Sequence, residues 1–550
     1  MGGAHGHAVG VDFGTSTSLV ATRAGRRPVQ VAPLGHSTRW FPSVAGYRGD
    51  TLVVGEDADA LPSDQVIRSI KRAITRNEDR VAVFGPAGTL EISADEVMIA
   101  LLAEIGARAT RAGEPLNQDR EFRLGCPAMW DGAQRNRLLE LAEKAGLPTD
   151  GSALVDEPIA AGIAWVSHRY LAYGEQPEGR LLVFDMGGGT LDIAVLDVVG
   201  GPHPEISVLT ALGAEYAGDM LDHAIARDLY EDLTAKGYDL TASRHPELLD
   251  ALVMRAAREA KVNLSRLAEH RVVLPSRQLG AVPVLTYTRE QLEEAFRPQM
   301  DEAERLVWAA LRAARLTERE SGSPDQLRSL GPAELISDVD YVLLAGGMSR
   351  IPYVGRRVGA LFPHAQVFDD AGVQADEAIV AGLADTAGYD RLNLHRPGFD
   401  FIVEWDENGQ TCQETLYAAH TPFYEAWQVL SGQANLGYER HDHAFPGPKH
   451  GRGRLRVRAT TGESLGLKFD DQVMDGIGLT FGRSMSFKLY CDGRILLRDG
   501  SGKRLDMKVD RWPVMRGRDH AQLVLRSAQR NSPTPPTPWY MEKEWAPPTR

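Results

Sequence analysis

Two short turns carry the residues best suited to chemistry in this 550-residue sequence. The first turn lies between two apolar runs and holds Asp12, Gly14, Thr15, Ser16 and Thr17. Backbone N–H groups and hydroxyls gathered in a tight turn can surround a phosphate group. The first turn therefore predicts a polyphosphate site.

The second turn repeats this plan later in the chain, between the apolar runs of RLLVFDMGGGTLDIAVLDVVG. Its residues are Asp185, Gly187, Gly188, Gly189, Thr190 and Asp192. Glycines let the backbone approach a phosphate without a clash from Cβ. A single Gly-rich turn is a weak signal, but a matched pair is a strong one and indicates an internal duplication.

Asp12 and Asp185 suit a magnesium ion, which prefers a few carboxylates together with water and phosphate oxygens. The alternative is that both residues only cap their turns. We favour the metal, because an aspartate beside a phosphate loop repels the ligand unless a cation lies between them.

A third turn follows the buried run that starts at Val339 and contains Gly346 and Gly347. Such a turn can admit a flat base or a ribose against the backbone, although Gly-Gly after a strand is often just a tight turn. The order of two phosphate turns and then a nucleoside turn predicts a nucleotide site.

Short apolar runs alternate with helical patterns from Ala8 to about Tyr389, which is typical of an α/β protein. We expect one helix over AQRNRLLELAEKAGL that ends near Gly146, a helix-rich stretch over 220–265, and a long helix starting at Thr288. The polar insertion at 318–332 is expected to be a surface loop.

Beyond Asp390 the pattern becomes strand-like. Strands are expected at EAWQVLS, RLRVRAT, SFKLY, RILLRD and AQLVLRS, with a hairpin turn at Asp492-Gly493, and we interpret this part as a β-sandwich or barrel. The predicted division is an ATPase domain at 1–389, a linker at 390–397, a β-rich domain at 398–530 and a Pro-rich tail at 531–550.

The tail presents Trp539, Tyr540 and Trp545 after its prolines. It is either a flexible end or an aromatic segment that docks on this protein or a partner.

Composition limits the function classes. A net charge of -14 argues against nucleic-acid binding. The sequence has no run of 18 apolar residues and no signal-like N-terminus, so we expect neither a membrane span nor secretion. Cys126, Cys412 and Cys491 form neither a disulfide framework nor a zinc pattern, which fits the cytoplasm. His441, His443 and His450 favour a solvated loop over a metal site.

Over about residues 8–388 the sequence resembles the seventy-kilodalton heat-shock (Hsp70, DnaK-like) chaperones of the actin-like ATPase superfamily. Besides the three turns, the resemblance rests on SIKRAI around Lys71, CPAMWDGAQR from Cys126, VDEPIAAGIAW from Val155 and ADEAIVAGLA from Ala375. It implies an actin-like α/β nucleotide-binding domain followed by a small all-β domain.

The resemblance implies ATP or ADP as ligand, with Mg²⁺ and also K⁺. The catalytic positions would be Lys71 and Glu157, which flank the γ-phosphate and the attacking water, with Asp12, Asp185 and Thr190. Thr15 and Ser16 would touch phosphates, Asp12 and Asp185 would hold the hydrated Mg²⁺, and Asp12 with Asp192 would lie near K⁺. The rest of the nucleotide pocket would be formed by Gly218, Lys261, Ser265, Gly346, Gly347, Met348, Arg350 and Asp376.

Some positions depart from the family pattern. Arg258 stands where an acidic residue is usual, Val262 where an arginine is usual, and Met348 where a serine is usual. Pro127 and Arg135 match residues that relay nucleotide state to the next domain. However, GYDRLNLHRPG replaces the acidic, leucine-rich linker, and no long helical lid follows.

The leading hypothesis is an ATP-hydrolysing, chaperone-like switch that couples nucleotide state to binding of a protein or peptide. The resemblance implies a J-domain co-chaperone and a nucleotide exchange factor as partners. Two alternatives are a small-molecule kinase of the same superfamily and a nucleotide-locked scaffold with little turnover.

Overall fold

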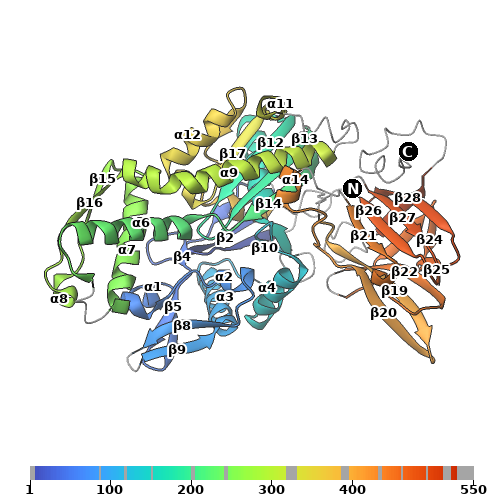
Figure 1. Ribbon diagram of the computed structural model, residues 1–550, viewed down its shortest axis with the longest axis horizontal. Helices are drawn as coiled ribbons and strands as arrows, with labels where there is room; N and C mark the ends of the chain where they lie inside the picture. Colours follow the sequence, from blue (N-terminus) through green and yellow to red (C-terminus); the bar gives the residue numbers. More distant parts are fainter. Residues whose placement is uncertain are drawn as a thin grey trace, which may run out of the picture.

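The computed structural model describes residues 7–25, 27–85, 88–116, 121–149, 153–199, 205–240, 246–317, 331–385, 396–431, 437–459, 462–490, 493–511 and 522–528. It shows an α/β part built on two central sheets and, beside it, a part made almost wholly of strands (Figure 1). Within these ranges every helix is too short or too polar to cross a lipid bilayer. The predicted tail at 531–550 and nearly all of the predicted loop at 318–332 lie outside the described residues.

The first central sheet grows from the hairpin that holds the first predicted turn. β1 (His7–Phe13) pairs antiparallel with β2 (Thr17–Ala24). β10 (Glu121–Cys126) lies parallel to β1, and β11 (Leu154–Asp156) lies parallel to β10. The short strands β3 (Gln30–Val31) and β4 (Phe41–Pro42) both pair with β2.

The second central sheet has the same plan around the second predicted turn. β12 (Gly179–Met186) pairs antiparallel with β13 (Leu191–Val199), and β14 (Glu205–Ala214) lies beyond β13. β17 (Tyr341–Ala345) lies parallel to β12, and β18 (Gln366–Phe368) lies parallel to β17. Since each sheet is one hairpin extended by two parallel strands, the predicted internal duplication is confirmed.

Two helices pack against each other between these sheets, α5 (Glu157–Tyr173) and α13 (Ala378–Asp385). They approach so closely that a Cβ placed on Gly382 would lie 1.7 Å from the carbonyl oxygen of Ala160. Only glycine fits there, because real Cβ atoms do not come within 3.0 Å of another heavy atom. The two helices thereby join the halves of the α/β part, which we call lobe I and lobe II.

Lobe I, built on the first sheet, carries its own helices and two small sheets. Its elements are β5 (Ala45–Arg48), β6 (Thr51–Val54), α1 (Glu56–Asp59), η1 (Ser63–Gln65), β7 (Val66–Ile67), α2 (Arg72–Thr75), β8 (Arg80–Gly85), β9 (Gly88–Ser93), α3 (Ala94–Arg111) and α4 (Gly132–Lys144). α4 is the helix expected to end near Gly146. It starts where the side chain of Asp131 accepts hydrogen bonds from the backbone N–H groups of Ala133 and Gln134.

Lobe II, built on the second sheet, carries the longer helices. Its elements are α6 (Gly218–Ala235), α7 (Pro246–Leu264), β15 (Glu269–Val272), α8 (Ser276–Leu279), β16 (Leu285–Thr288), α9 (Arg289–Thr317), α11 (Pro332–Ile336), η3 (Gly347–Arg350) and α12 (Pro352–Leu361). α6 and α7 confirm the helix-rich stretch predicted over 220–265, and α9 confirms the long helix predicted after Thr288.

The strand-rich part is a sandwich of two sheets. One sheet has the order β20-β19-β22-β25 and the other the order β21-β26-β27-β28-β29-β23-β24. The strands are β19 (Phe399–Glu407), β20 (Gln410–Tyr417), β21 (Gly437–His441), β22 (Gly451–Ala459), β23 (Gly466–Phe469), β24 (Gln472–Met474), β25 (Ile477–Phe481), β26 (Ser486–Tyr490), β27 (Arg494–Arg498), β28 (Arg504–Arg511) and β29 (Gln522–Ser527). The rings of Phe401 and Phe487 meet between the sheets at a centroid distance of 5.3 Å. We call this part the β-sandwich.

The strand predicted over EAWQVLS is wrong, because this segment forms the short helix α14 (Ala426–Ser431). The side chain of Gln428 accepts a hydrogen bond from the backbone N–H of Glu425 at 2.7 Å, which caps the helix start. Val429 is buried, and α14 packs on α9 of lobe II. An apolar run of this length does not distinguish a strand from a buried helical turn. The other four predicted strands are confirmed as β22, β26, β27 and β29.

The β-sandwich contacts both lobes. On lobe II, the hydroxyls of Tyr424 and Thr210 lie 3.1 Å apart, and Arg312 of α9 donates to the carbonyl of Leu430 at 3.4 Å. On lobe I, Arg396 donates to the carbonyl of Trp130 at 3.0 Å. The predicted boundary between 389 and 390 falls in a stretch outside the described ranges, so the division into domains stays a prediction.

Candidate functional site

The two Gly-rich turns face each other at the ends of their hairpins. A Cβ on Gly188 would lie 2.7 Å from Oγ of Ser16, and one on Gly189 would lie 2.6 Å from Oγ1 of Thr15. The second turn is closed by a hydrogen bond of 3.0 Å from the N–H of Gly187 to the carbonyl of Thr190. The structure thus brings together the hydroxyls and the glycines that were predicted to surround phosphates.

The first turn is closed just as tightly, since a Cβ on Gly14 would lie 2.2 Å from the carbonyl oxygen of Thr17, the first residue of β2. A side chain at position 14 would therefore change the backbone path of the phosphate turn.

The third turn also reaches this place. Gly346 has a φ of 79°, and a Cβ there would lie 2.6 Å from Oδ1 of Asp185. Its N–H donates to the carbonyl of Ala375 at 3.1 Å, and Gly347 begins η3 with open space beside it. The left-handed backbone and the close approach both explain why glycine is required at position 346.

Gly218 connects the second turn to the third. Its N–H donates to the carbonyl of Gly187 at 3.1 Å. A Cβ on Gly218 would lie 3.1 Å from Nζ of Lys261 and 3.2 Å from the sulfur of Met348. Gly218, Lys261 and Met348 therefore lie together next to the glycines of the second turn, as predicted for one nucleotide pocket.

Lys71 and Glu157 form a buried ion pair, with Nζ and Oε1 2.5 Å apart and residue exposures of 4% and 7%. Lys71 precedes α2, and Glu157 is the first residue of α5. Burial by itself lowers the pKa of Lys71, but attraction to Glu157 and Asp12 outweighs it, so the pKa is raised. Lys71 is therefore a fixed cation inside the site.

Three aspartates lie buried around this pair. Burial raises the pKa of Asp12 to about 7, with Glu157 and Asp376 adding to the shift and Lys71 opposing it. Burial, together with Glu157, also raises the pKa of Asp192 to about 7, although hydrogen bonds from Thr190 and Ala128 oppose the shift. The pKa of Asp185 is raised well above its ordinary value by burial and by the charges of Glu157, Asp192 and Asp12.

This excess of buried carboxylate fits a divalent cation. Oδ1 of Asp185 is buried and accepts no hydrogen bond, which is costly unless another group approaches it. Among the described residues no group of three or more His, Cys, Asp or Glu side chains is placed to bind a metal by itself. Magnesium does not need such a cage, since it keeps water and takes oxygens from a bound phosphate.

The part of the predicted nucleotide pocket around Lys261 is organised by Asp222, a residue that sequence reasoning missed. Asp222 is 2% exposed and contacts Nζ of Lys261 at 2.7 Å and Nε of Arg258 at 3.5 Å. Lys261 also donates to the carbonyl of Gly218 at 3.1 Å. The one available signal was that Asp222 occupies the buried face of an amphipathic helix, where an unpaired carboxylate is rare.

Two of the three predicted departures, Arg258 and Val262, lie on α7, and the third, Met348, lies on η3. The side chain of Val262 is largely exposed, with a residue exposure of 65%. The hydroxyl of Ser265 donates to the carbonyl of Val262 at 2.6 Å, a local contact within the chain.

Arg350 and Asp376, two further residues of the predicted pocket, form an ion pair of 2.5 Å between η3 and the segment before α13.

Arg135, one of the two predicted relay residues, is buried beside Asp156, the residue before Glu157. It contacts Oδ1 of Asp156 at 2.6 Å and donates to the carbonyl of Trp130 at 2.9 Å. Trp130 was also missed: its fully buried ring lies 5.4 Å from Nζ of Lys71. Pro127, the other relay residue, accepts through its carbonyl from the N–H of Trp130 at 3.2 Å.

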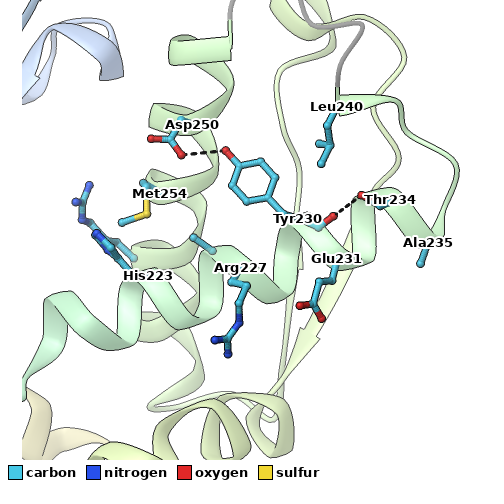
Figure 2. A pocket seen from close by; sticks show the side chains of 11 residues that line it. His223, Arg227, Tyr230, Glu231, Thr234, Ala235, Leu240, Asp250 and Met254 are labelled. Carbon is cyan, nitrogen blue, oxygen red and sulfur yellow. Dashed lines mark hydrogen bonds between the residues drawn. The ribbon is translucent and has the colours of Figure 1, made fainter.

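A separate groove of about 880 Å³ lies between α6 and α7 (Figure 2). It is lined by His223, Arg227, Tyr230, Glu231, Asp250, Met254 and Arg258, among others. The hydroxyl of Tyr230 donates to Asp250 at 3.1 Å across the groove. No predicted phosphate or metal residue lines it, so it is distinct from the three turns.

His441, one of the three histidines considered for a metal, has Nε2 2.8 Å from a carboxylate oxygen of Glu439. His441 ends β21, where about half of its side chain is exposed. His443 belongs to the short helical turn η5 (Asp442–Ala444) that follows.

Two lobes joined by closely packed helices, with two Gly-rich turns that face each other, define a nucleotide-binding protein of the actin-like class. Residues 8–391, more than half of the chain, match the family described as Hsp70 protein. The chain therefore belongs to the Hsp70 family, and its nucleotide-binding part has the actin-like ATPase fold of that family.

Curated relatives agree with this assignment. The chain is 30% identical to the "Chaperone protein DnaK" of Deinococcus deserti over 412 residues, which cover 69% of this chain and 59% of the relative. It is also 30% identical over 411 residues to a protein of that name from Thermus thermophilus, covering 69% and 60%. The protein of the same name from Deinococcus proteolyticus is 29% identical over 404 residues. The chain thus spans about three fifths of the length of these relatives.

Proposed function

We propose that this chain is an ATP-hydrolysing molecular switch of the chaperone class, in which nucleotide state alters how the β-sandwich holds a protein or peptide. The observation that carries the proposal is the buried Lys71–Glu157 pair, which lies with Asp12 and Asp185 between two facing phosphate turns. The names of the DnaK relatives support the chaperone class.

Hydrolysis of ATP by water needs positioning and charge neutralisation more than a covalent nucleophile. Lys71 supplies a fixed positive charge for the γ-phosphate. Glu157 holds Lys71 in place and has the residue type to orient an attacking water. The hydroxyls of Thr15, Ser16 and Thr190 and the backbone of the two turns position the phosphates.

Asp12 and Asp185 would hold Mg²⁺, which neutralises phosphate charge and orients phosphate oxygens when it is bound. The buried Oδ1 of Asp185, which accepts no hydrogen bond, supports this assignment. We assign K⁺ to the neighbourhood of Asp12 and Asp192. Asp192 is 1% exposed and accepts a hydrogen bond from the backbone N–H of Ala128 at 2.8 Å.

The proposed ligands of the β-sandwich are protein or peptide clients, and the proposed regulators are a J-domain co-chaperone and a nucleotide exchange factor. These partners follow from the family. The proposed compartment is the cytoplasm, in keeping with three scattered cysteines.

The small-molecule kinase is disfavoured because such an enzyme usually needs an aspartate facing a substrate hydroxyl, and here a lysine–glutamate pair fills that region. The nucleotide-locked scaffold is disfavoured because a scaffold has no need for Lys71, Glu157, Asp12 and Asp185 together.

The deciding experiment measures phosphate release from ATP with Mg²⁺ and K⁺, with and without a panel of extended peptides. Slow release that peptides stimulate supports the switch. Binding of ATP with no measurable release would instead favour the scaffold. Transfer of phosphate to an added small hydroxyl compound would favour the kinase.

A further inference from the structure

The groove of lobe II lies along two antiparallel helices, α6 and α7 (Figure 2). Asp222 of α6 contacts Arg258 of α7, and Tyr230, later in α6, donates to Asp250, which is earlier in α7. Because these contacts run in opposite order along the two helices, one end of the groove lies near Asp222 and the other lies beyond Tyr230. Its volume of about 880 Å³ is in the range of pockets that bind small molecules.

The end of the groove near Asp222 is basic. Its lining residues include His223 and Arg227 on α6 and Arg258 on α7. Arg227 lies 3.7 Å from a carboxylate oxygen of Asp228, and Nε of Arg258 lies 3.5 Å from one of Asp222, and both distances are longer than in a hydrogen-bonded pair. Burial lowers the pKa of Arg258 despite the neighbouring charge of Asp222. An anion placed between the two guanidinium groups would therefore form stronger contacts than they have now.

The middle of the groove is apolar. Ala226 is buried, and Met254 and Tyr230 are half-buried. The hydroxyl of Tyr230 donates to Asp250 at 3.1 Å, which holds the aromatic ring across the groove (Figure 2). A flat aromatic group packs well on such a ring and on a thioether. Asp250 and Glu231, the acidic lining residues, disfavour a second negative charge on the ligand.

The basic end is linked to the predicted nucleotide pocket through one buried carboxylate. Asp222 contacts Nζ of Lys261 at 2.7 Å as well as Nε of Arg258. Lys261 lies beside Gly218 in the predicted pocket. An anion that draws Arg258 toward the groove removes positive charge from Asp222. This side of the pocket then becomes more negative and attracts an anionic nucleotide less strongly.

We propose that the groove is a binding site for a small aromatic carboxylate. The carboxylate lies between Arg227 and Arg258, the ring packs on Met254 and Tyr230, and the bound ligand weakens nucleotide binding. Since Arg258 stands where an acidic residue is usual, the basic end is a feature of this chain rather than of the family pattern. The binding site stands on the groove alone, and its effect on the nucleotide rests on the proposed function.

The test uses naphthylacetate as the probe and naphthylacetamide as its uncharged analogue, with inorganic phosphate as a probe of charge alone. Binding is measured by calorimetry and by the NMR signal of the Met254 methyl group, which Met254→Leu assigns. The variants are Arg227→Gln and Arg258→Gln. The matched control is Arg255→Gln, because Arg255 lies on α7, pairs with Glu259 and is not one of the lining residues.

We expect naphthylacetate to shift the Met254 signal and to bind at least roughly tenfold more tightly than naphthylacetamide, the lower range for hydrogen bonds to charged groups. Arg227→Gln and Arg258→Gln should each reduce this preference, and Arg255→Gln should keep it. Phosphate should bind much more weakly. Naphthylacetate should raise the Kd for ADP by roughly fivefold or more, and saturating ADP should raise the Kd for naphthylacetate by the same factor without preventing the Met254 shift.

An unshifted Met254 signal, equal binding of the acetate and the amide, or equal binding of phosphate would overturn the site. So would a preference for the acetate that Arg227→Gln leaves unchanged, and this exposed residue decides if Arg258→Gln does not fold. Complete loss of the Met254 shift in saturating ADP would mean that the probe occupies the nucleotide pocket instead. An unchanged Kd for ADP would overturn the coupling. If the wild type binds no ADP, the proposed function fails, while the Met254 shift and Arg227→Gln still decide the groove.

Discussion

Nζ of Lys71 lies 2.5 Å from Oε1 of Glu157, and each charge is almost fully buried. The two residues come from different elements of lobe I, the segment before α2 and the start of α5. A buried ion pair contributes little stability compared with apolar residues of similar volume, but losing one partner leaves the other as an unpaired charge. The pair is therefore best explained by chemistry, and it is sensitive to single substitutions.

Lys71→Ala is expected to slow ATP turnover by roughly 100- to 1,000-fold, the usual effect of removing one group that stabilises transition-state charge. It also leaves Glu157 buried without its partner, so the melting temperature should fall. Adding Glu157→Gln should restore much of the stability but none of the turnover. Phosphate release and thermal melting measure the two effects separately, and full turnover in Lys71→Ala would remove this residue from the mechanism.

The stability of the ligand-free protein should depend on pH through Asp12 and Asp192. Their pKa of about 7 in the folded chain lies above the value near 4 of an unfolded chain. Between these two pKa values the folded chain binds more protons than the unfolded chain. The contribution of these groups to the free energy of unfolding is therefore fully present below about pH 4 and is lost as pH rises to about 7.

Asp12→Asn removes one of these titrations. Relative to wild type, the variant should gain free energy of unfolding at about pH 8, and the gain should shrink at about pH 5. Urea unfolding at both pH values measures it, and Asp50→Asn on the exposed surface serves as control. A gain that is equal at both pH values would contradict the assignment.

ADP should be held weakly, with a Kd in the micromolar range, because Val262 offers no guanidinium to stack on a base and is 65% exposed. Val262→Arg is expected to tighten ADP binding by roughly 2- to 30-fold, the range of a cation–π contact. Val273→Arg is the matched control, since Val273 is 64% exposed on the same lobe. Calorimetric titration decides, and a low-nanomolar Kd for the wild type would refute the prediction.

The hydroxyl contact between Tyr424 and Thr210 should contribute to docking of the β-sandwich on lobe II. Tyr424→Phe is expected to cost about 1 kcal/mol in free energy of unfolding, the net contribution of a typical hydrogen bond. Thr210→Val should cost a similar amount, and the double variant should cost less than the sum of the two. Additive losses in denaturant unfolding would show that the two hydroxyls do not interact.

The sequence predicted those parts of the molecule whose local pattern determines their structure. Both phosphate turns, the duplicated hairpins, α4 and α9 follow from Gly-rich turns and apolar periodicity within a few residues. The Lys71–Glu157 pair was found only through resemblance, because its two residues are 86 positions apart.

Contacts between distant segments could not be predicted in this way. Asp222 and Trp130 act through neighbours that only the folded chain brings near, and neither belongs to a recognisable motif. The helix α14 was mistaken for a strand because its conformation depends on packing against α9. Arg396 looked like one polar residue among several, and its burial against Trp130 depends on where the β-sandwich docks.

The packing of α14 on α9 has a consequence for how the chain folds during synthesis. Arg312 and Leu430, which join these helices, are 118 positions apart. A ribosome working at about 5–20 residues per second therefore completes α9 several seconds before its covering helix is made. During this interval the surface of lobe II that receives Tyr424 and Val429 is open to water. The surface of lobe II can be covered only after the first strands of the β-sandwich and α14 have emerged from the ribosome. Lobe II is therefore the last region of the nascent α/β part whose apolar surface becomes buried.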